Sequence, residues 1–201
     1  MLLDESHAIG VLGPSGRGAA AEAGLDGEID VVTGSLGTAL GAYGGFATCD
    51  QLTSRYLVNS ARTLLHSTAP PPVAVAAAMA ALDLLQAQPH RIEKLRANAA
   101  ALRDGLVREG FDVARSERHI VTLVVGAAEL AQRIVDAAVE QGVFAEAVLP
   151  PAVPEGTARL RLAVMASHTR SELREAASSL ARAARRCGFQ PGAGEALSFA
   201  A

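Results

Sequence analysis

Lysine is scarce in this chain. Of its 18 lysine and arginine residues, only Lys94 is a lysine. Any reaction that needs a lysine amine therefore has a single candidate. Because Lys94 lies between Glu93 and Leu95 in a charged stretch of expected helix, we predict that its amine faces solvent.

Positive charge is also in short supply. The formal net charge is -3 and the sequence pI is about 6.0. A chain with this balance has no excess positive potential, so neither nucleic acid nor an anionic membrane is expected as a partner. Arg185 and Arg186, near the C-terminus, are interpreted as a solvated helix end.

The sequence also lacks a cysteine pattern for disulfides or zinc, a leader and a membrane-spanning run. Cys49 and Cys187 are the two cysteines, and their separation fits neither a disulfide scaffold nor a zinc site. Asp4 and Glu5 follow Met1 closely, without a basic leader or a long apolar run. The expected compartment is the reducing cytoplasm, with no membrane association.

What is present indicates a folded α/β protein. Half of the 201 residues are hydrophobic, which is enough for one large or two small domains. Apolar runs, caps and glycine or proline stops predict short strands at 2–4, 29–33, 45–48, 120–125 and 158–164, and helices at 50–61, 73–88, 90–109, 128–141 and 171–186. The strand at 2–4 is expected to be buried. Thr169 or Ser171 is the expected cap of the last helix.

Strand, helix, strand and helix alternate after residue 110, which is typical of a compact α/β subdomain. We therefore expect residues 1–88 to form one part, which includes the start of the connecting helices. Residues 89–189 are expected to form a small α/β domain, and residues 190–201 a tail.

Chemistry-bearing residues stand just after the first strand, where open α/β sheets place their ligands. Residues 4–18 read D-E-S-H-A-I-G-V-L-G-P-S-G-R-G, and residues 33–41 read T-G-S-L-G-T-A-L-G. Further motifs are S-T-A-P at 67–70, V-P-E-G-T-A-R-L-R at 153–161 and A-S-H-T at 166–169. In order and spacing, these segments resemble the C-terminal half of the α-oxoamine synthases. Segment 153–161 is most similar to the 8-amino-7-oxononanoate synthase branch, and segment 33–41 to the 2-amino-3-ketobutyrate CoA ligase branch.

The resemblance implies a fold: the C-terminal part of a pyridoxal-phosphate fold type I large domain, followed by a small α/β C-terminal domain. It also implies a reaction, the condensation of an amino acid with an acyl-CoA on pyridoxal phosphate. By the same resemblance, Asp4 would pair with the pyridinium nitrogen of the cofactor, and His7 would hydrogen-bond its phenolic oxygen. Ser35 would lie beside the ring, and Ser67 and Thr68 would reach the phosphate held by a neighbouring subunit.

Two arginines complete the implied site. Arg161 matches the residue that grips the carboxylate of the amino-acid substrate, a bidentate role that suits a guanidinium. Arg159 is the alternative, because strand alternation places it on the same face.

The departure from the family is at Thr38. The family pattern (T/S)-x-(G/S)-K-(A/G)-x-G has its Schiff-base lysine where this chain has Thr38. A threonine hydroxyl can supply neither the primary amine nor the general base that the lysine provides. No catalytic residue is therefore assigned.

The segment that precedes the matched half in the family carries the ring stacked on the cofactor. Without it, the sheet is expected to leave an apolar face uncovered. A partner is therefore expected, either a second copy in a homodimer or a complete synthase in a hetero-oligomer.

Other site classes do not fit. The glycine loop at 13–18 is neither G-x-G-x-x-G nor a Walker sequence, and the five histidines lack metal-ligand spacing, so no metal is expected. No G-x-S-x-G elbow is present to support a serine hydrolase. Three hypotheses remain: a catalytically deficient subunit or pseudoenzyme, an enzyme with altered acyl-CoA or amino-acid chemistry that needs no lysine link, and a truncated non-functional fragment.

Overall fold

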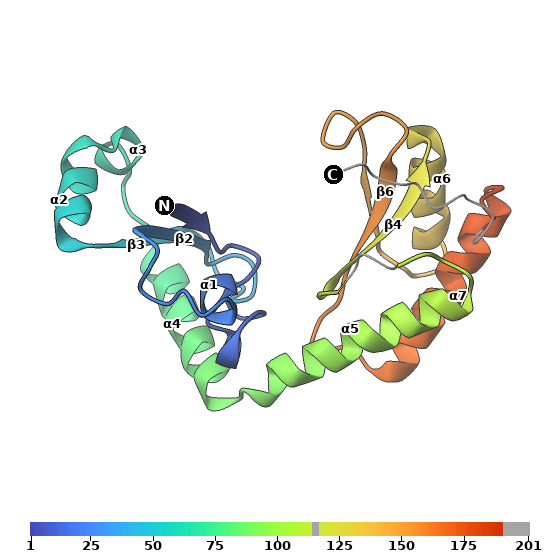
Figure 1. Cartoon of the computed structure of the whole chain (residues 1–201), viewed down its shortest axis with the longest axis horizontal. Helices are drawn as coiled ribbons and strands as arrows, with labels where there is room; N and C mark the ends of the chain where they lie inside the picture. The colour runs from blue at the N-terminus through green and yellow to red at the C-terminus, as the bar shows by residue number, and fades with distance from the viewer. Residues whose placement is uncertain (114–116, 191–201) are drawn as a thin grey trace. The chain divides into compact units, whose positions relative to one another are not determined.

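The computed structural model describes residues 1–113 and 117–190 (Figure 1). The chain divides into two compact units, Met1–Glu93 and a second that begins at Lys94. Most of the predicted tail at 190–201 lies outside the described residues. In the described part of the chain, none of the helices combines the length and the apolar character needed to cross a bilayer.

The first unit contains a three-stranded sheet in the order β1-β2-β3. Its strands are β1 (Leu2–Asp4), β2 (Val31–Ser35) and β3 (Gly45–Cys49). β1 runs parallel to β2, and β3 runs antiparallel to it. The expectation of a buried first strand was wrong, since Leu2 is 67% exposed. The cause is the position of β1 at the edge of a sheet with only three strands.

β2 lies two residues further along the chain than predicted. Its last residues, Gly34 and Ser35, pair with Phe46 and Gly45 of β3. A Cβ atom on Gly34 would come within 2.5 Å of the Phe46 ring, so a side chain there would have to displace the ring. The Phe46 ring thus packs over Gly34 across the strand pair that extends β2 beyond its predicted end.

The connection between β1 and β2 folds into two short helical segments that were not predicted. These are a 3₁₀ turn, η1 (Pro14–Gly16), and α1 (Ala19–Glu22). Gly13 has a φ of 73°, and a Cβ atom there would lie 2.4 Å from the Gly18 carbonyl oxygen. Glycine is therefore required by both the backbone conformation and the close approach of the loop to itself.

Three helices follow β3: α2 (Gln51–Ser60), α3 (Arg62–Leu65) and α4 (Pro72–Ala87). The predicted cap of α2 is confirmed, because the Asp50 carboxylate accepts a hydrogen bond of 2.6 Å from the Thr53 N–H. Neither α2 nor α3 has a buried residue. Both project from the edge strand β3 in Figure 1.

The helix α5 (His90–Arg108) begins at the end of the first unit and continues into the second. The second unit then contains β4 (Ile120–Gly126), α6 (Ala128–Val139), β5 (Glu146–Val148), β6 (Ala158–Ala163) and α7 (Arg170–Arg186). Its sheet has the order β4-β6-β5, and both pairings are antiparallel. The short strand β5 was not predicted.

Alternation along β6 separates the core from the surface of the second unit. Ala158, Leu160 and Leu162 are buried, while Arg159 and Arg161 lie on the opposite face and are half-buried. This confirms that the two arginines share a face. The buried face packs in a core with Leu106, Leu123, Ile134 and Leu180 among its largest members.

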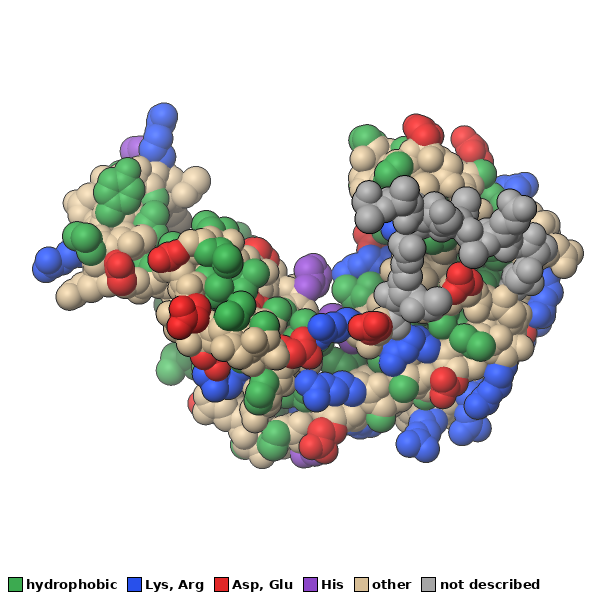
Figure 2. Space-filling view, viewed as in Figure 1, with side chains coloured by type: hydrophobic (Ala, Val, Ile, Leu, Met, Phe, Trp, Pro, Cys, Tyr) green, Lys and Arg blue, Asp and Glu red, His purple; other side chains and the backbone are tan. Residues whose placement is uncertain are grey.

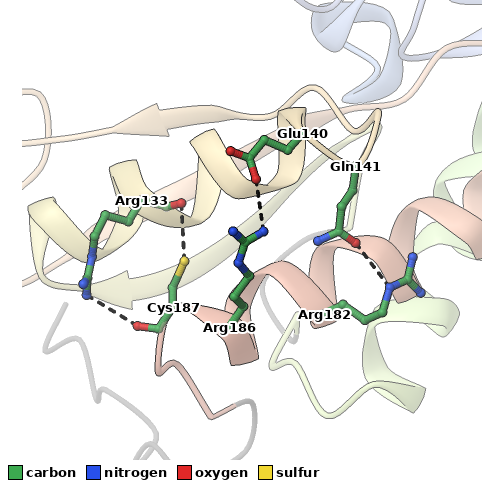
Figure 3. Close-up of polar contacts among 6 residues, drawn as sticks. All are labelled: Arg133, Glu140, Gln141, Arg182, Arg186 and Cys187. Atoms are coloured by element: carbon green, nitrogen blue, oxygen red, sulfur yellow. Dashed lines mark hydrogen bonds and ion pairs between the residues drawn. The ribbon is translucent and has the colours of Figure 1, made fainter.

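Polar contacts join α6 to the end of α7 (Figure 3). Arg185 and Arg186 are exposed, as predicted. Figure 3 draws Arg186 paired with Glu140 at 3.1 Å, Arg182 with Gln141, and Arg133 with Cys187 through two hydrogen bonds of 3.4 Å. Arg185 pairs with Glu109, the residue after α5, also at 3.1 Å. Because these groups are exposed, they align the helices rather than supply much stability.

Candidate functional site

Asp4 stands at the carboxyl end of β1, directly opposite Thr33 of the parallel strand β2. One carboxylate oxygen of Asp4 accepts a hydrogen bond from the Ser6 N–H, and the other accepts one from the Thr33 hydroxyl, both at 2.9 Å. The Ser6 and Thr33 hydrogen bonds lower the pKa of Asp4. The exposed carboxylate is thus held in its charged form at the edge where parallel sheets bind ligands.

Thr38 contacts the segment that follows Asp4. Its hydroxyl donates a hydrogen bond of 2.6 Å to the carbonyl oxygen of Ser6. The loop that carries Thr38 also packs on the segment after β1, because a Cβ atom on Gly10 would come within 2.6 Å of the Ala39 Cβ. The structure therefore brings Thr38 to Ser6, whose N–H donates to the Asp4 carboxylate.

Ser35 and His7 lie close to these residues in the chain. Ser35 ends β2, two residues beyond Thr33, and its hydroxyl oxygen accepts a hydrogen bond of 3.0 Å from the Gly37 N–H. His7 is exposed. The Ser6 and Thr33 hydrogen bonds are the main causes of the lowered pKa of Asp4, and the charge of His7 lowers it slightly further. Both residues are therefore available at the surface of the same edge.

Ser67 and Thr68 follow α3 and are exposed. Their side chains make no hydrogen bond within residues 1–113 and 117–190. The described chain thus does not join them to Asp4 by any contact. Their expected role toward a neighbouring subunit stays a prediction.

The two arginines belong to the second unit. The Arg161 guanidinium forms an ion pair with Glu146 of β5, with 2.8 Å between nitrogen and oxygen. Arg159 donates to the carbonyl oxygen and the hydroxyl oxygen of Thr157, both at 3.1 Å. Arg161 is therefore opposed by an acidic side chain, whereas Arg159 is tied to the turn that precedes its own strand.

Glu5 is a functional candidate that sequence reasoning left without a role. It is only 2% exposed, and its two carboxylate oxygens accept hydrogen bonds of 2.8 Å from the Ala19 and Ala20 N–H groups. A Cβ atom on Gly18 would lie within 2.7 Å of this carboxylate. Glu5, which directly follows Asp4, therefore fixes the glycine loop to the end of β1.

Thr33 and Glu146 were also missed. Thr33 lay within a quoted motif, and its place opposite Asp4 could have been found from the register of two parallel strands. No sequence signal marks Glu146, because β5 has only three residues. Across the described residues, no three His, Cys, Asp or Glu side chains gather closely enough to hold a metal ion.

The chain is similar in sequence to a known family and to named relatives. The model of the family described as aminotransferase class I and II matches residues 1–180. An 8-amino-7-oxononanoate synthase of Geobacter metallireducens is 42% identical over 183 residues, which cover 90% of this chain and 47% of that protein. Another, of Citrifermentans bemidjiense, is 38% identical over 190 residues, covering 94% and 49%.

Solved structures agree in fold. A serine palmitoyltransferase from S. paucimobilis with a bound pyridoxal phosphate–myriocin aldimine superposes with a TM-score of 0.86 at 31% identity, covering 93% of this chain and 48% of that one. The fold is thus mixed α/β, of the pyridoxal-phosphate fold type I class, and the resemblance to the α-oxoamine synthases is confirmed. The chain spans about half the length of the curated relatives it matches. It belongs to the aminotransferase class I and II family.

Proposed function

We propose that this chain is a lysine-less homologue of the pyridoxal-phosphate acyltransferases that condense an amino acid with an acyl-CoA. It acts as a subunit, and it does not catalyse the condensation alone. The observation that carries this proposal is Thr38, whose hydroxyl is bonded to the Ser6 carbonyl beside Asp4. The residue at the family's lysine position therefore contacts the segment after Asp4, and its side chain has no amine.

Asp4 and His7 suit the ring of pyridoxal phosphate, but Thr38 cannot form the covalent link to it. Asp4 has a lowered pKa because of the Ser6 and Thr33 hydrogen bonds, and a charged carboxylate suits a protonated ring nitrogen. Each carboxylate oxygen can accept more than one hydrogen bond, so Asp4 can bind a further donor. His7 is exposed beside it. No amine is available at Thr38, so these residues can hold and orient the ring without a covalent link.

Pyridoxal phosphate supplies an electron sink for carbanion chemistry when it is bound. The chain's own residues would then contribute charge at Asp4, a hydrogen bond at His7 and a carboxylate anchor at Arg161. What they lack is a group that removes a proton from the amino acid. Thr38 cannot do so at neutral pH, because its hydroxyl is a very weak base and already donates to Ser6.

Exposed apolar side chains in the first unit support a partner. Leu52 and Val73 are each 78% exposed, Tyr56 is 69% exposed and Met79 is 63% exposed. Large apolar surfaces of this kind are typical of protein interfaces. Green side chains of the first unit are visible at the surface in Figure 2. Ser67 and Thr68, exposed just after α3, would be presented at such an interface, either with a second copy or with a complete synthase.

Light scattering and co-purification test this proposal. We expect the purified chain to be at least dimeric at low micromolar concentration, and a stable monodisperse monomer would contradict the proposal. Co-expressed with a complete synthase, the chain should co-purify with it. Changing Ser67→Ala and Thr68→Ala together should then lower the activity of the complex. The matched control changes two nearby exposed hydroxyls, Ser54→Ala and Thr63→Ala, and should leave the activity unaltered.

A further inference from the structure

Glu146 is the acidic neighbour of the proposed substrate anchor. The antiparallel register of β5 and β6 pairs Glu146 directly with Arg161, so the two side chains leave the sheet on the same face. A Glu146 carboxylate oxygen lies 2.8 Å from a terminal guanidinium nitrogen of Arg161. The contact is thus built into the strand pairing.

The two side chains remain open to solvent and ligand. The Arg161 side chain is 31% exposed and the Glu146 side chain is 55% exposed. A guanidinium has five N–H donors, and Glu146 engages one terminal nitrogen. A ligand carboxylate can therefore still approach Arg161, but it approaches beside a second negative charge.

The neighbouring arginine on this face, Arg159, is not the register partner of Glu146. Arg159 pairs in register with Val148 rather than with Glu146, and its guanidinium donates to Thr157. A carboxylate arriving at Arg161 is consequently attracted by one guanidinium and repelled by Glu146. A ligand that also carries an ammonium group beside its carboxylate is attracted by both members of the pair.

We propose that Glu146 is a specificity-determining residue, which makes Arg161 select zwitterionic amino acids over simple carboxylates. Glu146 partly neutralises Arg161, so a monoanion binds weakly, and it offers the ligand's ammonium group a counter-charge. This inference rests on the proposed role of Arg161 as the anchor of the substrate carboxylate. No covalent step is involved.

Two probes that differ in the ammonium group test the inference, namely L-alanine and propionate. Each is titrated into the ¹⁵N-labelled full chain while the Nε–Hε signal of Arg161 is followed by NMR. The wild-type chain should bind L-alanine more tightly than propionate. In Glu146→Gln that preference should fall by about two- to fivefold, the range expected for one partly exposed charge pair.

Two further variants separate the possible failures. Glu140→Gln removes the same charge from the exposed pair with Arg186 on α6, and it should leave the preference unchanged. Arg161→Gln, whose binding is followed through the backbone amide signals of Leu160 and Leu162 instead, should abolish binding of both probes. If Arg161→Gln abolishes binding but Glu146→Gln keeps the full preference, the inference is overturned and the anchor stands. If the probes bind equally well to Arg161→Gln, the anchor itself is wrong and the inference falls with it.

Discussion

Asp4 is the residue on which the proposed cofactor role of the β1–β2 edge depends. Its carboxylate is exposed, yet two neighbouring groups hydrogen-bond to its charged form, first the Ser6 N–H and then the Thr33 hydroxyl. These bonds lower its pKa below the ordinary value. The charge of Asp4 is therefore maintained by the protein itself, which is what a carboxylate needs if it is to pair with a protonated ring nitrogen.

The lowered pKa of Asp4 predicts an acid limb in stability. A carboxyl group whose pKa is lower in the folded state stabilises that state above its unfolded pKa, about 4. The stabilisation is lost as pH falls through the lowered folded pKa. The difference in free energy of unfolding between wild type and Asp4→Asn, measured by urea titration, should therefore be constant above about pH 5 and should shrink below about pH 4.

A second substitution checks the cause. Thr33→Val removes one of the donors to Asp4 and should reduce the pH-dependent part of that difference. A difference between wild type and Asp4→Asn that does not vary between pH 7 and pH 2.5 would contradict this account of the Asp4 pKa.

Sequence reasoning located some of these residues and not others. Asp4, Ser35 and Thr38 stand in motifs with fixed spacing, so they could be named before their contacts were known. Glu146 could not, because its relation to Arg161 arises from the pairing of two strands across a long loop. Local pattern carries no information on which residue a strand will meet across a sheet.

At the scale of elements, α1 depends on a residue outside it. α1 has four residues, and its N-cap residue, Gly18, offers no side-chain hydrogen bond. Glu5 takes over this role, since its carboxylate accepts from the N–H groups of Ala19 and Ala20. A helix this short is not stable by itself, so the buried carboxylate is what holds the loop in place.

Glu5→Ala is therefore expected to destabilise the chain. It leaves two part-buried N–H groups without their acceptor and should lower the free energy of unfolding by about 2 kcal/mol. Glu28→Ala, at an exposed position of the same connection, is the matched control and should stay within about 0.5 kcal/mol of wild type. Equal losses for the two variants, measured by urea unfolding, would show that the Glu5 contacts contribute nothing particular.

The long helices could be predicted from the sequence, whereas several of the short segments could not. α4, α5 and α7 are long and have recognisable ends, among them the Thr169–Glu172 capping box that decides between Thr169 and Ser171 as the cap. α1, α3 and β5 have three or four residues each. Segments of that length form because of tertiary contacts, such as those of Glu5, so their own residues hold no signal.

At the scale of the whole molecule, the chain has two compact units, and the residues predicted to contact cofactor and substrate are divided between them. Asp4, His7, Ser35 and Thr38 lie in the first unit, and Arg161 lies in the second. The domain division predicted between residues 88 and 89, and the roles of these residues toward cofactor and substrate, stay predictions. The family and the α/β fold could be reached from five ordered motifs, because such motifs mark the residues that contact ligands.

The central claim is that this family member has no lysine amine at position 38, where the family has its Schiff-base lysine. The direct measurement is to incubate the purified chain with pyridoxal phosphate, reduce it with borohydride, and locate any covalent adduct by peptide mass spectrometry. Because Thr38 offers a hydroxyl and the exposed Lys94 lies far along the sequence in α5, we predict no stoichiometric adduct on a lysine. A stoichiometric adduct on Lys94, lost in Lys94→Arg and retained in Glu28→Ala, would contradict the account.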